Sequence, residues 1–261
     1  MGSTSNFTIV ALLILGTWAS QAISQMSLEA APAKKHEEWM AQYGRNYADN
    51  AEKEKRFKIF NDNVNFIEQF NKYRNRTYKM RVNGFADLTK EEFLSQFTGF
   101  DVSACSSGLV PGRKLKSFRY ENLTDVPGTV DWRNQGAVTP VKNQRRCGNK
   151  SSMNIYEKVP SNSEEALQKA VYIQPVSVAV DATNFQFYSK GVVSDDCGTR
   201  LNHGVTIIGY GTTEDNTKYW LVKNSWGEDW GEKGYIRILR DSDSPGGQCG
   251  IAMVASYPII A

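Results

Sequence analysis

The sequence predicts an α+β chain in which a helical N-terminal part is followed by a β-rich C-terminal part. In residues 32–98, apolar side chains recur at three- and four-residue steps, which is the period of one helix face. From about Val126, short β-branched and aromatic runs alternate with Gly, Asn and Asp, as in the strands of an antiparallel sheet or barrel. The chain has 261 residues, enough for one or two domains. We therefore expect a boundary near residue 126.

The first part predicts an amphipathic helical segment from Ala33 to Tyr43 and then a longer helix. Asp49 and Glu52 have the three-residue spacing of a capping box, so the longer helix is expected to begin there. Four of its residues recur at helical steps and share one face: Phe60, Val64, Ile67 and Asn71.

A further helix is expected to begin at the Thr89–Glu92 capping box and to end at Phe97. Residues 101–117 are rich in Ser and Gly and predict a linker. In the β-rich part, Ser161 and Glu164 are expected to cap one short helix. Strands are expected in residues 171–180, 204–210, 219–222 and 235–239.

The first residues predict a secretory signal peptide over residues 1–24. No charged side chain occurs from Met1 to Ser24, and the apolar core from Thr8 to Trp18 is shorter than the roughly 20 residues that span a bilayer. Small residues at Ser20 and Ala22, and again at Ser24, fit a cleavage site. The alternative is a buried N-terminal helix. The net charge of only +3 argues against a nucleic-acid partner, and no later segment predicts a membrane span.

Secretion permits disulfide bonds. The chain has four cysteines, at positions 105, 147, 197 and 249, and their spacing leaves all three possible pairings open.

The longer helix carries a motif with the spacing E-x3-R-x3-F-x2-N-x3-I-x3-N. It resembles the inhibitory propeptide of papain-like cysteine proteases, plant senescence-associated and vacuole-directed ones in particular. The alternative is an ordinary amphipathic helix with a Glu–Arg pair. A second propeptide motif, G-x-N-x-F-x-D, is matched except that Arg81 replaces the glycine, which puts the local turn in question. The matching residues are Glu52, Arg56, Phe60, Asn63, Ile67 and Asn71 in the first motif, and Asn83, Phe85 and Asp87 in the second.

The resemblance continues beyond residue 126. The stretch from Val126 to Gln144 is similar to the mature N-terminus of this family, which implies that the Gln144 amide contributes to an oxyanion hole. By the same resemblance His203 is the catalytic histidine and Asn224 the residue that orients it. Trp226 resembles the tryptophan that shields this pair from water, and the family implies a disulfide between Cys197 and Cys249.

The nucleophile of this family is absent from its expected position. Cys147-Gly148 match the start of the family's C-G-[SA]-C-[WY] signature, but Asn149, Lys150 and Ser151 stand where Ser-Cys-Trp is expected. Position 150 lies 53 residues before His203 and 74 before Asn224. The family places the two roughly 130–150 residues after the nucleophile, so about 75–80 residues are missing at both. One contiguous deletion between Gly148 and Asn149 explains both shortfalls.

We therefore expect a signal peptide (1–24), an inhibitory prodomain with linker (25–125) and a truncated peptidase domain (126–261) that lacks most of the helical catalytic domain. Cys147 resembles a structural half-cystine whose partner is lost, so Cys147 and Cys105 are expected to be unpaired. The resemblance implies protein or peptide substrates, no metal and no cofactor. It also implies a secretory route to the vacuole, lysosome or extracellular space.

Three functions follow from the deletion. The first is a family member that is inactive, or nearly so, as written. The second is a binding protein whose prodomain inhibits intact relatives in trans. The third is a residual peptidase that uses Cys147 as its nucleophile, aided by the adjacent cations Arg145 and Arg146. The loss of the helical domain is also expected to expose an apolar face of the remaining domain.

Overall fold

The computed structural model describes residues 31–73, 75–100, 117–143, 156–195 and 197–259. The chain divides into two compact units, residues 1–63 and 64–261, which are described separately. Helix α2, Asn50–Lys72, contributes to both units. In the described residues, no helix combines the length and apolar character needed to cross a membrane.

The first unit consists of a helical segment, residues 31–43, and the first part of α2. The Glu52 backbone N–H donates to Asp49 Oδ1 at 2.8 Å, which confirms half of the expected capping box. His36 and Trp39 pack against the ring of Phe60, with centroids 5.0 and 5.2 Å apart. Because Phe60 is 1% exposed, the aromatic cluster forms the core of this unit.

The second unit begins with the rest of α2, a short strand β1 (Tyr78–Met80) and helix α3 (Lys90–Phe97). The Thr89 side chain accepts from the Glu92 N–H, and the Glu92 side chain accepts from the Thr89 N–H, so the predicted capping box is present. The predicted end of this helix at Phe97 is also correct.

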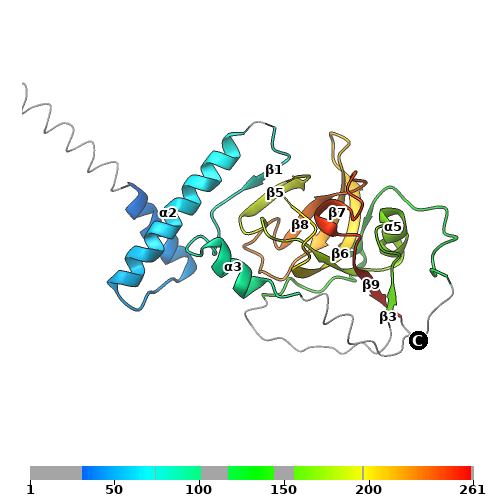
Figure 1. The fold of residues 1–261 in the computed structure, drawn as a ribbon, viewed down its shortest axis with the longest axis horizontal. Helices are drawn as coiled ribbons and strands as arrows, with labels where there is room; N and C mark the ends of the chain where they lie inside the picture. Colours follow the sequence, from blue (N-terminus) through cyan, green and yellow to red (C-terminus); the bar gives the residue numbers. More distant parts are fainter. Residues whose placement is uncertain (1–30, 74, 101–116, 144–155, 196, 260–261) are drawn as a thin grey trace, which may run out of the picture. The chain divides into compact units, whose positions relative to one another are not determined.

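A mixed sheet forms the body of the second unit (Figure 1). Its strand order in the described residues is β1-β5-β8-β7-β6-β4-β9-β3, and β2 pairs with β6 outside this path. The pairs are antiparallel except for β5 with β8, which is parallel. The strands are β2 (Val130–Asp131), β3 (Tyr156–Lys158), β4 (Val176–Val180), β5 (Tyr188–Val193), β6 (His203–Thr212), β7 (Lys218–Lys223), β8 (Tyr235–Leu239) and β9 (Ala255–Pro258).

Two sequence predictions differ from the structure near residue 170. Helix α5 runs from Glu164 to Ile173, so residues 171–173 are helical and the strand begins only at Val176. Pro175 explains why the helix ends at Ile173, since a proline disfavours helical backbone at the residue before it, here Gln174. The N-cap is Ser163, not Ser161, and its side chain accepts from the Ala166 N–H.

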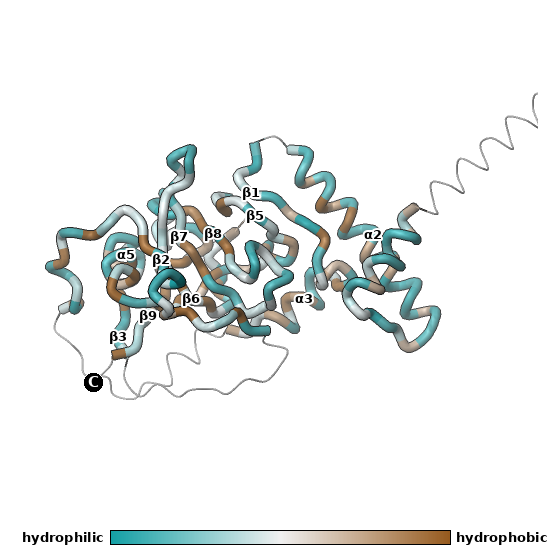
Figure 2. The backbone as a smooth tube through the Cα atoms, turned by 180° about the vertical axis from the view of Figure 1, so that it is seen from behind, coloured by the Kyte–Doolittle hydropathy of each residue, from teal (hydrophilic) through white to brown (hydrophobic). Residues whose placement is uncertain are grey.

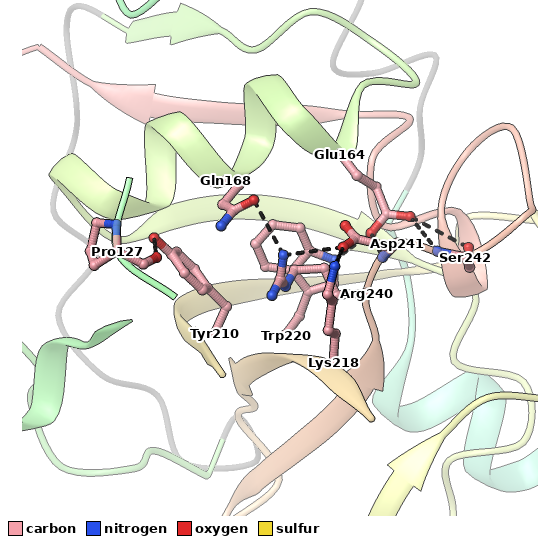
Figure 3. Close-up of polar contacts among 9 residues, drawn as sticks. All are labelled: Pro127, Glu164, Gln168, Tyr210, Lys218, Trp220, Arg240, Asp241 and Ser242. Atoms are coloured by element: carbon pink, nitrogen blue, oxygen red, sulfur yellow. Dashed lines mark hydrogen bonds and ion pairs between the residues drawn. The ribbon is translucent and has the colours of Figure 1, made fainter. Parts of the chain in front are cut away.

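Helix α5 is fixed to the sheet by a partly buried polar cluster (Figure 3). Both carboxylate oxygens of Glu164 accept hydrogen bonds: Oε2 from the indole Nε1 of Trp220 at 2.8 Å and from the Asp241 N–H at 2.9 Å, Oε1 from the Ser242 N–H at 3.1 Å. The guanidinium of Arg240, which is 5% exposed, lies 5.7 Å from the Trp220 ring centroid. These contacts join the first turn of α5 to the loop after β8.

The hydrophobic residues gather along the central strands (Figure 2). Ile207, Trp220, Val222 and Ile236 are all 0% exposed. Contrary to expectation, the large apolar side chains of the described residues do not gather on one uncovered face of the sheet. In the described part of the chain the exposed ones lie on or just after α2 and at the end of α5: Phe66, Tyr73 and Ile173.

Candidate active site

His203 and Asn224 are brought together by two adjacent antiparallel strands. His203 is the first residue of β6, and Asn224 follows the last residue of β7. Thr206 pairs with Lys223 in this ladder, which places the start of one strand beside the end of the other. His203 Nε2 lies 2.8 Å from Asn224 Oδ1, and both residues are buried, at 4% and 3% exposed.

This geometry fixes the tautomer of the neutral imidazole. Asn224 Oδ1 also accepts from the Ser225 N–H at 2.7 Å, which identifies it as the amide oxygen. An amide oxygen carries no proton, so His203 Nε2 is the donor of the 2.8 Å bond. The acceptor lone pair of the ring is then on Nδ1. A histidine held in this way can take a proton from a nucleophile at Nδ1.

Burial lowers the pKa of His203, and the hydrogen bond to Asn224 offsets part of that decrease. Desolvation dominates because the imidazolium would lose its hydration in this position. His203 is therefore neutral at neutral pH, in the state that a general base requires.

Trp226 packs over the histidine as a lid. Its ring is stacked on the His203 ring, with centroids 4.7 Å apart and planes inclined by 27°. It also contacts Trp230 and Phe93 edge to face at 4.9 Å each. The indole Nε1 donates to the Phe97 carbonyl at 3.1 Å. The tryptophan therefore belongs both to the site and to the contact with α3.

The segment after α3 covers the start of β6. The backbone N–H groups of Gly99 and Phe100 both donate to the Asn202 carbonyl at 2.9 Å. A Cβ built on Gly204 would lie 3.7 Å from the Phe100 ring. Sequence reasoning did not identify this cover, because nothing in residues 97–100 indicates a partner more than 100 positions away.

The segment that leads to Gln144 reaches the same site. Asn143 forms an antiparallel bridge with Trp226, and the Gly227 N–H donates to the Lys142 carbonyl at 3.1 Å. Gln144 itself lies outside the described residues, as do Cys147 and Cys105. Both cysteines of the described residues are joined in the Cys197–Cys249 disulfide, with their Cα atoms 5.0 Å apart.

The first propeptide motif forms local contacts in the first unit. Glu52 Oε1 accepts from Arg56 Nε at 2.6 Å, and Phe60 is in the aromatic core. Asn63 is half-buried on α2. Of the motif residues in the second unit, Ile67 is 4% exposed. Asn71 donates from Nδ2 to the Met80 carbonyl at 2.8 Å and accepts from its N–H at 3.0 Å, which holds β1 against the end of α2.

The second motif binds to the loop before β5. Asn83 Nδ2 donates to the Gln186 carbonyl at 2.8 Å, and Gln186 Nε2 donates to the Phe85 carbonyl at 3.1 Å. Phe85 lies 6.4 Å from the Trp226 ring, and Asp87 is 4% exposed.

The backbone at Arg81, where the propeptide motif has glycine, is held by a hydrogen bond to the segment before β5. Its N–H donates to the Phe187 carbonyl at 3.0 Å and its guanidinium to the Asp229 carbonyl. Arg81 is not among the residues with positive φ, so a side chain is tolerated at this position.

No group of three or more His, Cys, Asp or Glu side chains in the described ranges is arranged to hold a metal ion. The chemistry of the site is that of a neutral histidine held by an amide and shielded by an indole.

Two family models match the chain. The cathepsin propeptide inhibitor domain matches residues 36–93, and the papain family cysteine protease matches residues 149–259. The senescence-specific cysteine protease SAG39 of Oryza sativa subsp. japonica is 38% identical, over 97% of this chain and 97% of that protein. The chain belongs to the papain family of cysteine proteases.

Solved precursors of this family share the fold. The recombinant stem bromelain precursor has a TM-score of 0.74 at 34% identity, covering 88% of this chain and 99% of that chain. The proform of the ragweed pollen protease Amb a 11 has a TM-score of 0.78 at 30% identity, covering 89% and 96%. The alignment with the rice protease extends over 338 positions against a chain of 261 residues, so at least 77 aligned positions lack a residue here.

Proposed function

We propose that this papain-family precursor has the histidine and asparagine of the catalytic site but does not hydrolyse peptides, because the segment that carries the nucleophile is absent. The observation that carries the proposal is the length of the alignment relative to this chain, taken with the start of the protease-family match. At least 77 aligned positions have no counterpart, and the protease-family match begins only at Asn149. The 53 residues between position 150 and His203 point to the same junction.

The charge state of the site supports this reading. In papain-type catalysis the cysteine attacks the substrate carbonyl carbon as a thiolate, after its proton has passed to the histidine, here to Nδ1 of His203. The described residues offer no free thiol to that nitrogen, since Cys197 and Cys249 form a disulfide. Loss of the nucleophile of a catalytic triad costs about 10⁶-fold in turnover.

The decisive experiment is a gain of function. Purified chain is assayed with a dipeptidyl fluorogenic substrate, before and after the aligned segment of the rice protease is inserted between Gly148 and Asn149. We expect background hydrolysis from the chain as written and peptidase activity after insertion and acid processing. His203→Ala in the inserted protein is the control and should abolish activity. Hydrolysis by the unmodified chain, removed by Cys147→Ala, would instead establish residual catalysis through Cys147.

A second candidate function is inhibition of intact relatives in trans. It is favoured by the match of residues 36–93 to an inhibitor domain. Contacts within the chain oppose inhibition in trans, because β1 already pairs with β5 and α3 already packs on Trp226. A target protease has to compete with these contacts.

The trans inhibitor is tested by titrating an active papain-like protease with the full-length chain. Inhibition in the nanomolar range that is lost in Phe60→Ala and retained in Phe66→Ala supports it. Phe60 is 1% exposed and Phe66 52% exposed, so the two variants delete the same ring from a core and from a surface. No inhibition by the chain, or equal inhibition by both variants, removes this candidate.

Entry into the secretory pathway, through a signal peptide over residues 1–24, is part of the same proposal. The Cys197–Cys249 disulfide is consistent with an oxidising compartment. Vacuolar delivery is checked by fusing residues 1–125 to a fluorescent protein in plant cells.

A further inference from the structure

Residues 118–123 precede the stretch that resembles a mature N-terminus, and they pack against the β-rich part of the chain. Residues 118–123 form two consecutive turns, closed by the Glu121 N–H on the Phe118 carbonyl and by the Leu123 N–H on the Tyr120 carbonyl, each at 3.1 Å. Its residues contact Lys169 of α5, Glu157 of β3 and Tyr257 of β9. These three elements are neighbours in both views (Figures 1 and 2), and we call the surface that they present to this segment the groove. It contains no regular helix or strand, so its position depends on side-chain contacts.

An arginine and an aromatic ring make the main contacts. Arg119 donates to both carboxylate oxygens of Glu157, with Nε at 3.2 Å from Oε2 and Nη2 at 3.2 Å from Oε1. The neighbouring ring of Tyr120 lies 5.3 Å from the ring of Tyr257. A bidentate arginine–carboxylate contact is geometrically specific, and here it is paired with an adjacent aromatic contact.

The groove is shaped to receive this pair. The Glu157 side chain is only 10% exposed and accepts from the Tyr257 hydroxyl at 2.5 Å, so its carboxylate is held in one orientation on the edge strand β3. Lys169 Nζ donates to the Glu121 carbonyl at 3.1 Å, and Gln174 Nε2 lies 3.4 Å from the Tyr120 hydroxyl. Burial and the Glu157 charge raise the pKa of Tyr257, which therefore stays a hydroxyl donor.

The groove is not filled by the segment. A pocket of about 270 Å³ adjoins Tyr120 and is lined on its apolar side by Ile173, Pro258 and Ile259. Ile173 is 40% exposed although it is a large apolar side chain. Since Arg119 and Tyr120 also line this pocket, we expect it to admit an aromatic ring larger than that of tyrosine at position 120.

We propose that the groove of α5, β3 and β9 is a binding site for peptides that carry an arginine followed by an aromatic residue, and that residues 118–123 occupy it in cis. Its partners are protein segments with this dipeptide, displayed in an exposed turn. The site is independent of His203 and of the nucleophile, so it functions whether or not the chain hydrolyses peptides.

Residues 118–123 of the same chain compete with a free peptide for the groove, and this competition determines the size of the measured effect. A tethered ligand has an effective concentration of about 1 mM, so it weakens the binding of a free peptide of about 100 µM intrinsic affinity by about tenfold. The probe is a fluorescein-labelled peptide with the sequence of residues 117–125, measured by fluorescence anisotropy on the full-length chain. Arg119→Glu in the protein expels the cis segment, because a carboxylate then faces Glu157. We expect this variant to bind the peptide about tenfold more tightly than the wild-type chain.

Substitutions in the peptide keep the test independent of protein folding. A peptide carrying Arg119→Glu should not bind, and one carrying Tyr120→Trp should bind more tightly because the indole enters the pocket. In the protein, Glu157→Gln should weaken binding of the unmodified peptide. Glu214→Gln, at an exposed carboxylate between β6 and β7, makes the same chemical change away from the groove and should not alter binding. Equal binding of the Arg119 and Arg119→Glu peptides, or no binding to the Arg119→Glu protein, refutes the proposal and makes residues 118–123 a fixed part of the fold.

Discussion

Substitution of Phe93 by alanine should separate α3 from the site that it covers. Phe93 is 0% exposed and touches the rings of Phe85 at 5.2 Å, Phe97 at 5.3 Å and Trp226 at 4.9 Å. It is therefore surrounded by aromatic rings from α3, from the motif before α3 and from the loop after β7. Because these rings are rigid, they cannot relax far into a cavity at this position.

The expected loss in the free energy of unfolding is about 3–5 kcal/mol, the range for deleting a fully buried phenylalanine. Domain stabilities are about 5–15 kcal/mol in total, so this one change removes a large share of the stability. Phe93→Leu retains most of the volume and should cost clearly less. Phe66→Ala deletes the same ring from a 52% exposed position on α2 and should change the stability by less than about 1 kcal/mol.

Equilibrium urea unfolding, followed by circular dichroism and by tryptophan fluorescence, measures these differences. Coincident transitions justify the two-state treatment. If Phe93→Ala and Phe66→Ala lose the same free energy within about 1 kcal/mol, the packing of α3 on Trp226 does not stabilise the unit and the reasoning is refuted.

Three further changes have calculable effects. Reduction of the Cys197–Cys249 disulfide, which closes a separation of 52 residues, should lower the free energy of unfolding by about 4 kcal/mol in urea titrations with and without reductant; an unchanged midpoint contradicts this. Glu164→Ala leaves a buried indole N–H and two backbone N–H groups without their acceptor (Figure 3) and should cost about 1–3 kcal/mol per unsatisfied buried donor. Glu165→Ala, at a side chain 80% exposed, should cost less than about 0.5 kcal/mol in the same urea titrations, and equal losses for the two variants would contradict this. Because burial lowers the pKa of His203, the unfolded chain binds a proton below about pH 6.5 that the folded chain does not, so stability falls as the pH decreases from 7 to 5, by at most about 1.4 kcal/mol per pH unit; His203→Gln should flatten this slope, and an unchanged slope places the titration elsewhere.

The elements predicted correctly from sequence are those fixed by local interactions. The Thr89–Glu92 box specifies where α3 begins, and the β-branched run of Tyr235–Leu239 specifies β8. Four of the missed strands, β1, β2, β3 and β9, have only two to four residues, and β5, with six, was missed as well; all of them depend on partners. β1 has three residues and exists because Asn71 and β5 satisfy its backbone groups. No local pattern encodes such a contact.

The candidate site shows the same division. The resemblance predicted His203 and Asn224, and the structure places them 2.8 Å apart because their strands are neighbours. The cover by Gly99 and Phe100 requires the fold, since it depends on a carbonyl of Asn202 that sequence spacing does not relate to α3. The groove around Glu157 could not be predicted from the sequence either, because its residues come from segments that are far apart in the chain.

The double use of Trp226 affects how related sequences should be interpreted. In a lineage that has lost hydrolysis, mutations at His203 and Asn224 carry little catalytic penalty, yet replacement of the indole still removes its contacts with Phe93 and Trp230. Natural selection for folding alone then preserves this tryptophan. The histidine and asparagine can be substituted, because the packing of α3 and of residues 99–100 does not depend on their catalytic role. A survey of genes with the same gap can date the loss of catalysis from the ratio of substitutions at these positions.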